Sequence, residues 1–202
     1  MVKKVYLVRH GDKIREPGDP GLSPLGKKQA MLVGKYLSQF PIDNIICSPL
    51  SRARLTAEII NRYVDCCVIK TSDLLKERMN WGNNPGQSIQ DFLKEWRKAS
   101  INRSWKPSSG DSAMIASKRF KKVILSKLKN TKRGLILVSH GGIISDYLMD
   151  NFSSELLDNK IEGFSKRVLE GVSECSITEL SFENDRNFPK LIKLGNVKHL
   201  EI

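Results

Sequence analysis

Short apolar segments that alternate with helical patterns constrain the fold of this chain more than any other feature. The expected parallel strands are residues 3–8, 44–47, 66–69 and 134–139. Between the first three of these, the apolar residues of 24–40 and 51–63 recur at helical spacing. Ser23 and Pro24 are the residue types preferred at a helix N-cap and at the first helical position. Short strands that are apolar throughout are typical of a parallel sheet that is buried on both faces.

The second half of the chain completes the expected architecture. A helix is expected over 142–149, directly after the most apolar strand. Residues 176–182 and 191–194 alternate in the manner of antiparallel edge strands. This order predicts a single α/β domain over 1–202, a three-layer sandwich with a mostly parallel sheet flanked by helices. The long region 73–132 is expected to form an inserted helical cap over the sheet.

Charge and cysteine content narrow the classes of function. The 202 residues carry 34 Lys and Arg against 22 Asp and Glu, and the net charge of +12 favours anionic partners such as nucleic acid, acidic membrane or phosphorylated molecules. No apolar run approaches the roughly 20 residues of a membrane span, and the apolar stretch near the N-terminus is too short for a signal peptide. The 4 cysteines form no CxxC pair, so we expect reduced thiols in a cytoplasmic protein.

Two of the 3 histidines directly follow expected strands. Arg9 and His10 end the first strand, His140 and Gly141 follow the most apolar strand, and Arg52 lies shortly after the second. The carboxyl ends of parallel strands meet at one sheet edge, where α/β proteins bind ligands. Arginine matches phosphate oxygens, and an unprotonated imidazole is a nucleophile toward phosphorus. The sequence therefore predicts a phosphate site at this edge, whereas so few histidines argue against a His-rich metal site.

Several ordered motifs resemble those of the histidine phosphatase superfamily, also called the phosphoglycerate mutase-like family. The matching segments are residues 5–11 with the Arg-His-Gly motif, 22–30, 46–57, 75–78, 110–112 and 138–142. The resemblance covers nearly the whole chain. It implies phosphoryl-transfer chemistry that requires neither a metal ion nor a cofactor.

The resemblance also implies a role for each matching residue. His10 would attack phosphorus and form a phosphohistidine. Arg9 and Arg52 would hold the transferring phosphoryl group, and His140 would help to hold it and would stabilise charge. Glu77 would protonate the leaving oxygen and later activate water. Other carboxylates that could supply this acid are Glu58, Glu95 and Asp111.

Further residues are candidates for substrate contacts. They are Lys13, Ser48, Arg78 and Gly141. Ser48 could equally bond the start of the next helix, and Arg78 could equally form a structural ion pair. Asp12-Lys13 departs from the family pattern, in which an acidic residue or Gln is followed by Thr or Ser, and no Asn occurs in 14–21. Lys13 would add a cation near the phosphate, whereas the missing Asn removes one expected phosphate contact.

A basic run and a group of aromatic residues leave alternatives open. Residues 118–133 contain Lys118, Arg119, Lys121, Lys122, Lys127, Lys129, Lys132 and Arg133, and no acid. Such a run is typical either of a solvated helix face or of an electrostatic funnel for polyanionic substrates. Trp96 lies at helical spacing from Phe92 and Leu93, so we expect it in the core rather than in a nucleic-acid site. His199 is expected to be structural or exposed.

These observations predict a metal-independent phosphomonoester hydrolase that acts through a phosphohistidine on small phosphorylated metabolites. The alternative is phosphoglycerate mutase-type phosphoryl transfer, although the modest insertion favours hydrolysis. A non-catalytic basic binding protein on the same scaffold is a third hypothesis, and the presence of a nucleophile at His10 argues against it. The expected partner is a small phosphorylated substrate, with no nucleic acid and no membrane, and the oligomeric state stays open.

Overall fold

The computed structural model describes residues 2–64, 69–166, 170–183 and 188–201. Its strands are β1 (Val2–Arg9), β2 (Asn44–Cys47), β3 (Lys70–Thr71), β4 (Gly134–Ser139), β5 (Ile177–Glu183) and β6 (Lys190–Asn196). Its α-helices are α1 (Pro24–Leu37), α2 (Ser51–Val64), α3 (Ile89–Ile101), α4 (Ala113–Leu128), α5 (Gly141–Asn151) and α6 (Ser154–Lys160). Its short 3₁₀ helices are η1 (Asp73–Leu75), η2 (Phe164–Lys166) and η3 (Lys198–Leu200).

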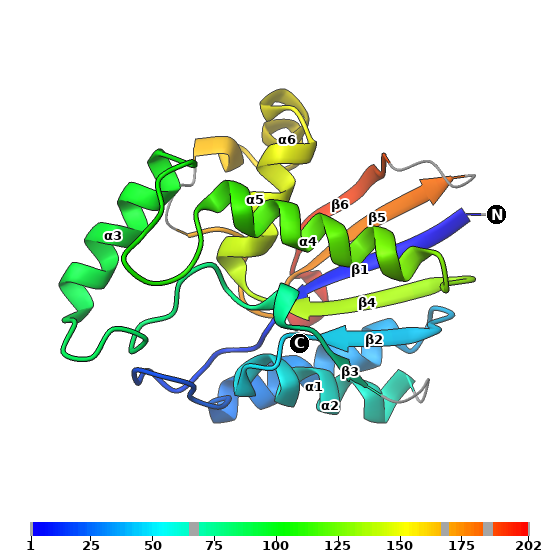
Figure 1. Ribbon diagram of the computed structural model, residues 1–202. Helices are drawn as coiled ribbons and strands as arrows, with labels where there is room; N and C mark the ends of the chain where they lie inside the picture. The colour runs from blue at the N-terminus through cyan, green and yellow to red at the C-terminus, as the bar shows by residue number, and fades with distance from the viewer. Residues whose placement is uncertain (1, 65–68, 167–169, 184–187, 202) are drawn as a thin grey trace.

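A 6-stranded sheet in the order β3-β2-β4-β1-β5-β6 forms the centre of the described chain (Figure 1). Neighbouring strands from β3 to β1 pair in parallel, whereas β5 pairs antiparallel with both β1 and β6. The predicted sheet, mostly parallel with an antiparallel edge, is therefore confirmed. The strand expected over 66–69 lies, apart from Ile69, outside the described residues, and β3 begins at Lys70.

Helices cover both faces of the sheet, which confirms the three-layer prediction. Successive residues of a strand point to opposite faces, and β1 shows the consequence. Tyr6 packs with Ile60 of α2 in one buried cluster, and α1 belongs to the same layer. Leu7 packs with Phe120 of α4 and Ile144 of α5 in the other cluster. This arrangement needs strands that are apolar throughout, because helices cover both faces of the sheet.

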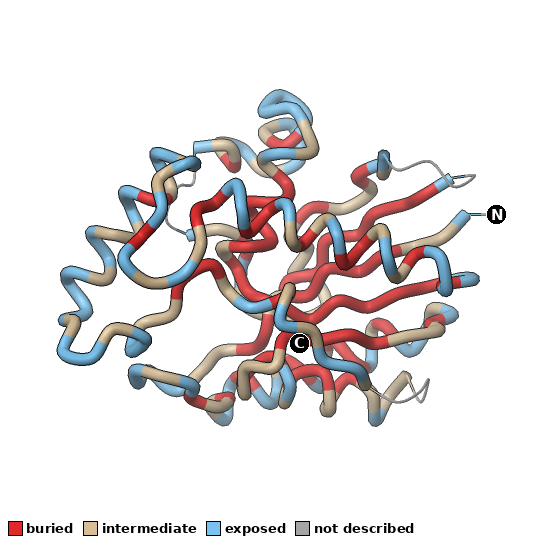
Figure 2. The backbone as a smooth tube through the Cα atoms, in the orientation of Figure 1, coloured by how far each residue is buried: buried red, intermediate tan, exposed pale blue. Residues whose placement is uncertain are grey.

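The region expected as a cap, 73–132, divides between two parts of the molecule. α4 belongs to the helical layer, because Phe120 and Ile124 lie in the same buried cluster as Leu137 of β4. α3 instead lies beyond the carboxyl ends of the strands, with most of its length exposed or half-buried (Figures 1 and 2). Ala99 is its one buried residue. The part that projects from the sandwich is thus narrower than the expected insertion and is centred on α3.

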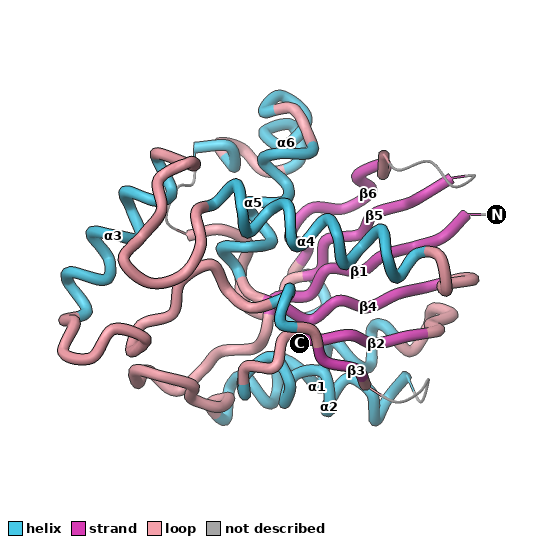
Figure 3. Tube along the Cα trace, in the orientation of Figure 1, coloured by secondary structure: helices cyan, strands magenta, loops and turns pink. Residues whose placement is uncertain are grey.

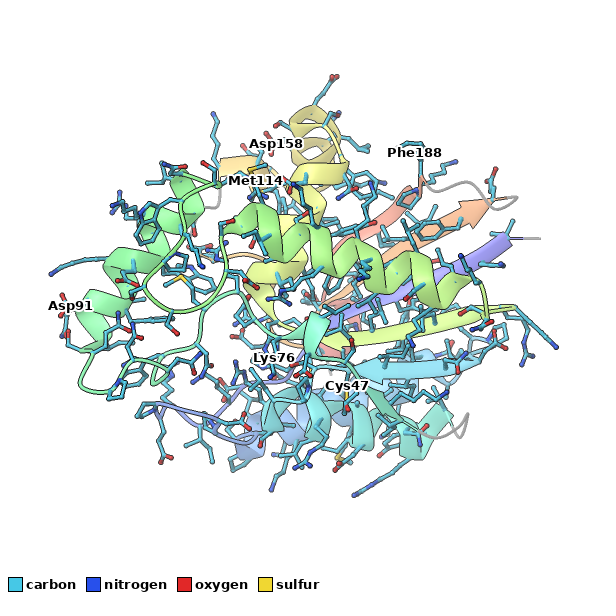
Figure 4. All side chains as sticks on the ribbon, in the orientation of Figure 1. Cys47, Lys76, Asp91, Met114, Asp158 and Phe188 are labelled. Atoms are coloured by element: carbon cyan, nitrogen blue, oxygen red, sulfur yellow. The ribbon has the colours of Figure 1, made fainter. Side chains whose placement is uncertain are left out.

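The basic run of 118–133 faces solvent along α4 and ends away from α3. Arg133 pairs with Asp43, which lies just before β2, so this part of the run lies at the amino ends of the strands. Lys121 lies over the Phe188 ring at 5.7 Å. Figure 4 shows Phe188 at the opposite end of the molecule from α3. From Lys121 onward this run is therefore a solvated face distant from the carboxyl ends of the strands. Arg119 is the exception, because its side chain is 13% exposed, pairs with Asp111 and helps to lower the pKa of His140.

The carboxyl ends of the parallel strands carry the long connections, and Figure 3 shows loops gathered there. Helices start close to this edge. Ser23 caps α1 by accepting a hydrogen bond from Gly26 N–H, and Pro24 is the first helical residue, as predicted. α5 begins immediately after β4, at Gly141. Within the described ranges, no helix is both long enough and apolar enough to cross a membrane.

Candidate active site

Two buried histidines meet at the carboxyl ends of β1 and β4. The parallel register pairs Arg9 with Ser139, so His10 and His140, which follow them, lie side by side. His10 N–H donates to Ser139 O at 2.9 Å. The two imidazole centroids are 5.1 Å apart in an edge-on arrangement, and the residues are 5% and 1% exposed. Strand pairing therefore brings together two residues that are far apart in the sequence.

His10 is held in one orientation as a neutral imidazole. Its Nδ1 lies 2.7 Å from Gly11 O, which can only accept a hydrogen bond, so the ring proton is on Nδ1 and Nε2 carries the lone pair. Arg52 Nε donates to this Nε2 at 3.3 Å. Burial, followed by the charges of Arg52 and Arg9, holds the pKa of His10 well below 6.5. At neutral pH, Nε2 is therefore available as a nucleophile.

Arg52 lies in the first turn of α2 and is buried beside His10, with 3% exposure. Its Nη2 donates to Asn80 Oδ1 at 3.0 Å, and Asp19 lies 3.8 Å from its Nη1. Within the part of the chain that the structure describes, Nη1 has no hydrogen-bond partner. Arg52 is thus oriented by two contacts and keeps one buried N–H group unused.

Arg9, the last residue of β1, is anchored by the segment that precedes β5. Its Nη1 donates to Val172 O at 2.7 Å, and its Nη2 forms an ion pair with Glu174. Its Nε is buried without a hydrogen-bond partner among the described residues. Gly141 allows this position, because a Cβ there would lie 3.0 Å from Arg9 Nη1. The first residue of α5 therefore has to be small for Arg9 to reach its place.

His140 is oriented by Ser48. Its Nε2 lies 2.8 Å from Ser48 Oγ, and the same Oγ accepts from Leu50 N–H at 3.3 Å. The Ser48 hydroxyl is thereby placed to donate to Nε2, which favours the tautomer with the ring proton on Nδ1. That Nδ1 is buried and has no partner within the described ranges. Burial, and then the charge of Arg52, holds the pKa of His140 well below 6.5.

Three buried N–H groups around His10 therefore lack an acceptor in the described chain: Arg9 Nε, Arg52 Nη1 and His140 Nδ1. Leaving a buried donor unpaired is costly, so such groups favour an acceptor that can reach them. Donors of this kind, two of them guanidinium groups, are suited to the oxygens of a phosphoryl group. We refer to Arg9, His10, Arg52 and His140 together as the floor.

Glu77 caps the helix that follows His140. Its Oε2 accepts from Gly142 N–H and its Oε1 from Ile143 N–H, both at 2.8 Å, and Oε1 also accepts from Arg78 N–H at 2.9 Å. A carboxylate accepts about four hydrogen bonds, so a position is left for a proton. Gly142 fits closely here, because a Cβ would lie 2.8 Å from Glu77 Oε1. A negative side chain at a helix N-terminus is also favoured by the helix dipole.

The other carboxylates considered for the acid lie away from this place. Glu58 is 3.8 Å from Arg54, Glu95 accepts from Ser108, and Asp111 pairs with Arg119. They do not line the cavity above the floor, whereas Glu77 does.

Arg78 forms a structural ion pair. It donates to both carboxylate oxygens of Asp146 on α5, at 2.8 and 2.9 Å, and its guanidinium lies over the Trp96 ring at 4.1 Å. Arg103 also pairs with Asp146, at 3.1 Å. Burial raises the pKa of Asp146 to about 6, although both arginines act to lower it. Of the two roles considered for Arg78, the structure places it as the ion pair, outside the cavity lining.

A cavity of about 690 Å³ lies above the floor. Of the candidate residues, Arg9, His10, Lys13, Arg52, Glu77 and Gly141 line it. His140 and Ser48 are not among the lining residues, although the His140 ring contacts the His10 ring. The opposite side is made by residues of α3 and by Met79 and Trp81. No group of three or more His, Cys, Asp or Glu side chains within the described ranges is arranged to hold a metal ion.

Residues 5–195 match the sequence profile of the histidine phosphatase superfamily (branch 1). The chain belongs to the histidine phosphatase superfamily. A superfamily relative from Bacillus subtilis, named uncharacterized phosphatase PhoE, is 36% identical over 46% of this chain, and the match spans only 50% of that relative. A relative from Escherichia fergusonii, named probable phosphoglycerate mutase GpmB, is 31% identical over 68% of this chain and 69% of its own length.

Solved structures share the fold of this chain. A mycobacterial glucosyl-3-phosphoglycerate phosphatase superposes with a TM-score of 0.73 at 23% identity, over 96% of this chain and 100% of that chain. A phosphoserine phosphatase variant from Entamoeba histolytica superposes with a TM-score of 0.71 at 24% identity, over 98% and 99% of the two chains.

The structure adds two residues to the site that the motifs of the superfamily did not indicate. Asn80 lines the cavity, accepts from Arg52 and donates to Gly18 O at 2.6 Å. The family pattern has an Asn in the loop over 14–21 that this chain lacks, and here the Asn80 side chain reaches that loop from another segment. Glu174 also lines the cavity, beside Arg9. No sequence signal marks Glu174, because its position depends on how the chain enters β5.

Trp96 corrects one expectation drawn from the sequence. Its helical spacing predicted a place in the core, but it is half-buried and lines the cavity, with Arg78 over its ring. Periodicity identifies which residues share a helix face, and α3 turns that face toward the cavity.

His199 is half-buried, with its Nε2 3.0 Å from Cys175 O and its ring stacked on Tyr36.

Proposed function

We propose that this protein hydrolyses phosphomonoesters through a phosphohistidine formed on His10. One observation carries the proposal: a neutral, buried His10 lies among three N–H groups, on Arg9, Arg52 and His140, that have no hydrogen-bond acceptor among the described residues. Phosphoryl oxygens accept hydrogen bonds and carry negative charge that is spread over them in the transition state. Fixed donors in a water-poor site stabilise such charge without reorganisation.

In the first step, the lone pair of His10 Nε2 attacks phosphorus, an N–P bond forms and the ester P–O bond breaks. Arg52 Nε–H now donates to Nε2, so it has to pass to a phosphoryl oxygen when the lone pair is used. The leaving oxygen takes the electron pair of the broken bond. It receives the proton of the Glu77 carboxylic acid, which leaves Glu77 as a carboxylate.

In the second step, the Glu77 carboxylate accepts a proton from water, and the water oxygen attacks phosphorus. The N–P bond breaks, and its electron pair returns to Nε2 as a lone pair. Inorganic phosphate leaves, and Glu77 is again an acid. Gly11 O holds Nδ1–H in both steps, so the same nitrogen serves as nucleophile and leaving group.

The names of relatives support this class of reaction and suggest a second candidate. The Bacillus subtilis relative is named as a phosphatase, and the Escherichia fergusonii relative as a probable phosphoglycerate mutase. A mutase uses the same phosphohistidine but returns the phosphoryl group to a hydroxyl of the substrate rather than to water. Incubation with 3-phosphoglycerate separates the two: a phosphatase releases inorganic phosphate, and a mutase forms 2-phosphoglycerate.

The proposal includes a small phosphorylated substrate and no metal ion, because Arg9 and Arg52 supply the positive charge. It also includes a cytoplasmic location, which the free, buried thiols of Cys47 and Cys175 support.

Hydrolysis of 4-nitrophenyl phosphate in EDTA, with a His10→Ala variant beside the wild type, tests the proposal. We expect the wild type to turn over in EDTA, and His10→Ala to lose about 10³-fold or more of kcat. Circular dichroism of both proteins shows whether the variant is folded. A requirement for added metal, or activity that survives in folded His10→Ala, would contradict the mechanism.

A further inference from the structure

The apolar face of α3 is not buried in the protein core. Ile89, Phe92, Leu93 and Trp96 follow the spacing of one face of an amphipathic helix. In most globular proteins such a face packs against the core, but here Ile89 is 36% and Leu93 52% exposed. Ala99 is the only buried residue of this helix. We refer to Ile89, Phe92, Leu93 and Trp96 as the α3 wall.

The α3 wall faces the cavity that lies above His10. Each of its four residues lines this cavity, and Met79 and Trp81 extend the apolar surface along the segment before α3. About 690 Å³ is within the range of cavities that hold a whole small molecule, and far more than a phosphoryl group needs. Because the phosphoryl group is assigned to the floor, the wall lies where the rest of the ester extends.

Two of the polar groups beside the wall, on Trp81 and Arg78, are already bonded within the protein. Trp81 Nε1 donates to Gln87 O at 3.2 Å. Arg78 covers the Trp96 ring, but its terminal nitrogens donate to Asp146 and Ser100. The wall therefore offers aromatic and aliphatic carbon, and few donors that could replace water around a hydroxyl-rich or carboxylated ligand. Lys94 and Arg97 also line the cavity from exposed positions on α3.

We propose that the substrates are phosphate monoesters of bulky, apolar alcohols, such as aromatic or long alkyl alcohols, rather than polyhydroxylated or carboxylated ones. The inference rests on the proposed function of the floor. An apolar leaving group gains free energy by covering the exposed wall, whereas a polar one loses hydrogen bonds to water. In this proposal, the wall determines which phosphate monoesters are preferred, and the floor transfers the phosphoryl group.

Esters with similar leaving-group reactivity test the inference, because aryl phosphates react faster for chemical reasons alone. We would measure kcat/KM for 2-phenylethyl phosphate, hexyl phosphate, glycerol 1-phosphate and 3-phosphoglycerate, all of which release a primary alkoxide. We expect 2-phenylethyl and hexyl phosphate to exceed glycerol 1-phosphate by about 10- to 100-fold. A ratio near 1, or a preference for either polar ester, would overturn the inference.

Leu93→Gln tests whether the wall causes the preference. We expect the ratio of kcat/KM for 2-phenylethyl phosphate to that for glycerol 1-phosphate to fall by about 3- to 10-fold. Ile101→Gln is the matched control, because Ile101 is on the same helix, is 65% exposed and does not line this cavity. An unchanged ratio in Leu93→Gln, or an equal fall in Ile101→Gln, would contradict the role of the wall.

These outcomes separate a failure of the inference from a failure of the proposed function. If the wild type hydrolyses none of the four esters and 4-nitrophenyl phosphate is also stable, the proposed function is wrong. If 4-nitrophenyl phosphate is hydrolysed by His10 but the alkyl series shows no apolar preference, only the inference is wrong.

Discussion

Three floor residues, Arg9, His10 and Arg52, border the same cavity as the α3 wall, and the floor and the wall are built in opposite ways. The floor residues His10, Arg52 and His140 are at most 5% exposed, and Arg9 ends a central strand. The wall residues Ile89 and Leu93 are 36% and 52% exposed. Arg9, His10 and His140 lie at the ends of strands that are buried on both faces, and Arg52 lies in the first turn of α2. The wall belongs to a helix with one buried residue, so it can change without disturbing the sandwich.

Under the proposed function, this difference assigns phosphoryl transfer to the floor and substrate selection to the wall. Phosphoryl transfer needs donors and a nucleophile held to within a fraction of an ångström, which a strand end beside a parallel partner provides. Recognition of an apolar group needs an apolar surface of suitable area and shape, and a half-exposed helix face provides such a surface. Substitutions in the floor should therefore affect every substrate, and substitutions in the wall should affect substrates unequally.

The largest expected effect is on stability, at the ion pair that joins helix α5 to the α3 wall. Arg78 pairs with Asp146 of α5 and covers Trp96 of α3. Arg78→Met leaves a buried carboxylate with only Arg103, so we expect the free energy of unfolding to fall by about 3–5 kcal/mol, measured by urea denaturation. Arg103→Met is the control, and the half-exposed position of Arg103 predicts a smaller loss. A loss below about 1 kcal/mol in Arg78→Met would show that this ion pair does not join the two regions.

Arg52→Ala tests the floor by activity. Arg52 contacts His10 and keeps an unpartnered Nη1, so we expect kcat/KM to fall by about 10²- to 10³-fold for apolar and polar esters alike. Arg54→Ala, two residues away on the exposed side of α2, serves as the control and should leave kcat/KM unchanged. If Arg52→Ala alters the ratio between esters and not the absolute rates, the division between floor and wall is wrong.

The buried histidines of the floor also predict how stability depends on pH. Their pKa values are well below 6.5 in the folded protein because of burial and the charge of Arg52. Below pH 6.5 the unfolded chain binds protons that the folded protein does not, so stability falls as the pH falls toward the folded pKa values. Each histidine contributes a slope of about 1.4 kcal/mol per pH unit.

A His10→Gln variant isolates this contribution. Urea denaturation between pH 6 and pH 5 should show a slope that is smaller by about 1.4 kcal/mol per pH unit than that of the wild type. Asp146 has its pKa raised to about 6 and acts with the opposite sign, but it is present in both proteins and cancels in the difference. Equal slopes would mean that His10 titrates normally in the folded protein.

The smallest expected effect concerns the orientation of His140. Ser48 holds its Nε2 at 2.8 Å, so Ser48→Ala should lower kcat/KM about fivefold, the value of one net hydrogen bond. Every ester should be affected equally, because Ser48 does not reach the wall. The exposed Ser38 provides a control, Ser38→Ala, with no expected change. A substrate-dependent effect of Ser48→Ala would assign it to substrate binding instead.

The sequence was sufficient to predict the floor for a physical reason. Apolar strands pair in parallel, and residues just after them must meet at one edge, so His10 and His140 could be placed together before any distance was known. The N-cap at Ser23 and the strand over 134–139 were likewise determined locally. Local pattern and core packing agree in these elements.

The wall and its support depend on contacts between distant segments, which periodicity does not contain. The spacing of α3 correctly grouped Phe92, Leu93 and Trp96 on one face, but it could not show that this face meets a cavity. Glu174, which lies just before β5 and far from Arg9 in the sequence, forms an ion pair with Arg9. Asn80 accepts a hydrogen bond from Arg52 and lies in a loop. Such contacts are set by how the connections fold over the strand ends.

The formation of a phosphohistidine on His10 is the central claim, and rapid-quench labelling tests it most directly. Wild type and Glu77→Gln would be mixed with ³²P-labelled 4-nitrophenyl phosphate, whose leaving group needs no proton. We predict protein-bound label that is stable to base and labile to acid, maps to the peptide containing His10, and accumulates further in Glu77→Gln because water is activated more slowly. Turnover with no protein-bound label in either protein at any quench time, or label on a residue other than His10, would contradict the account.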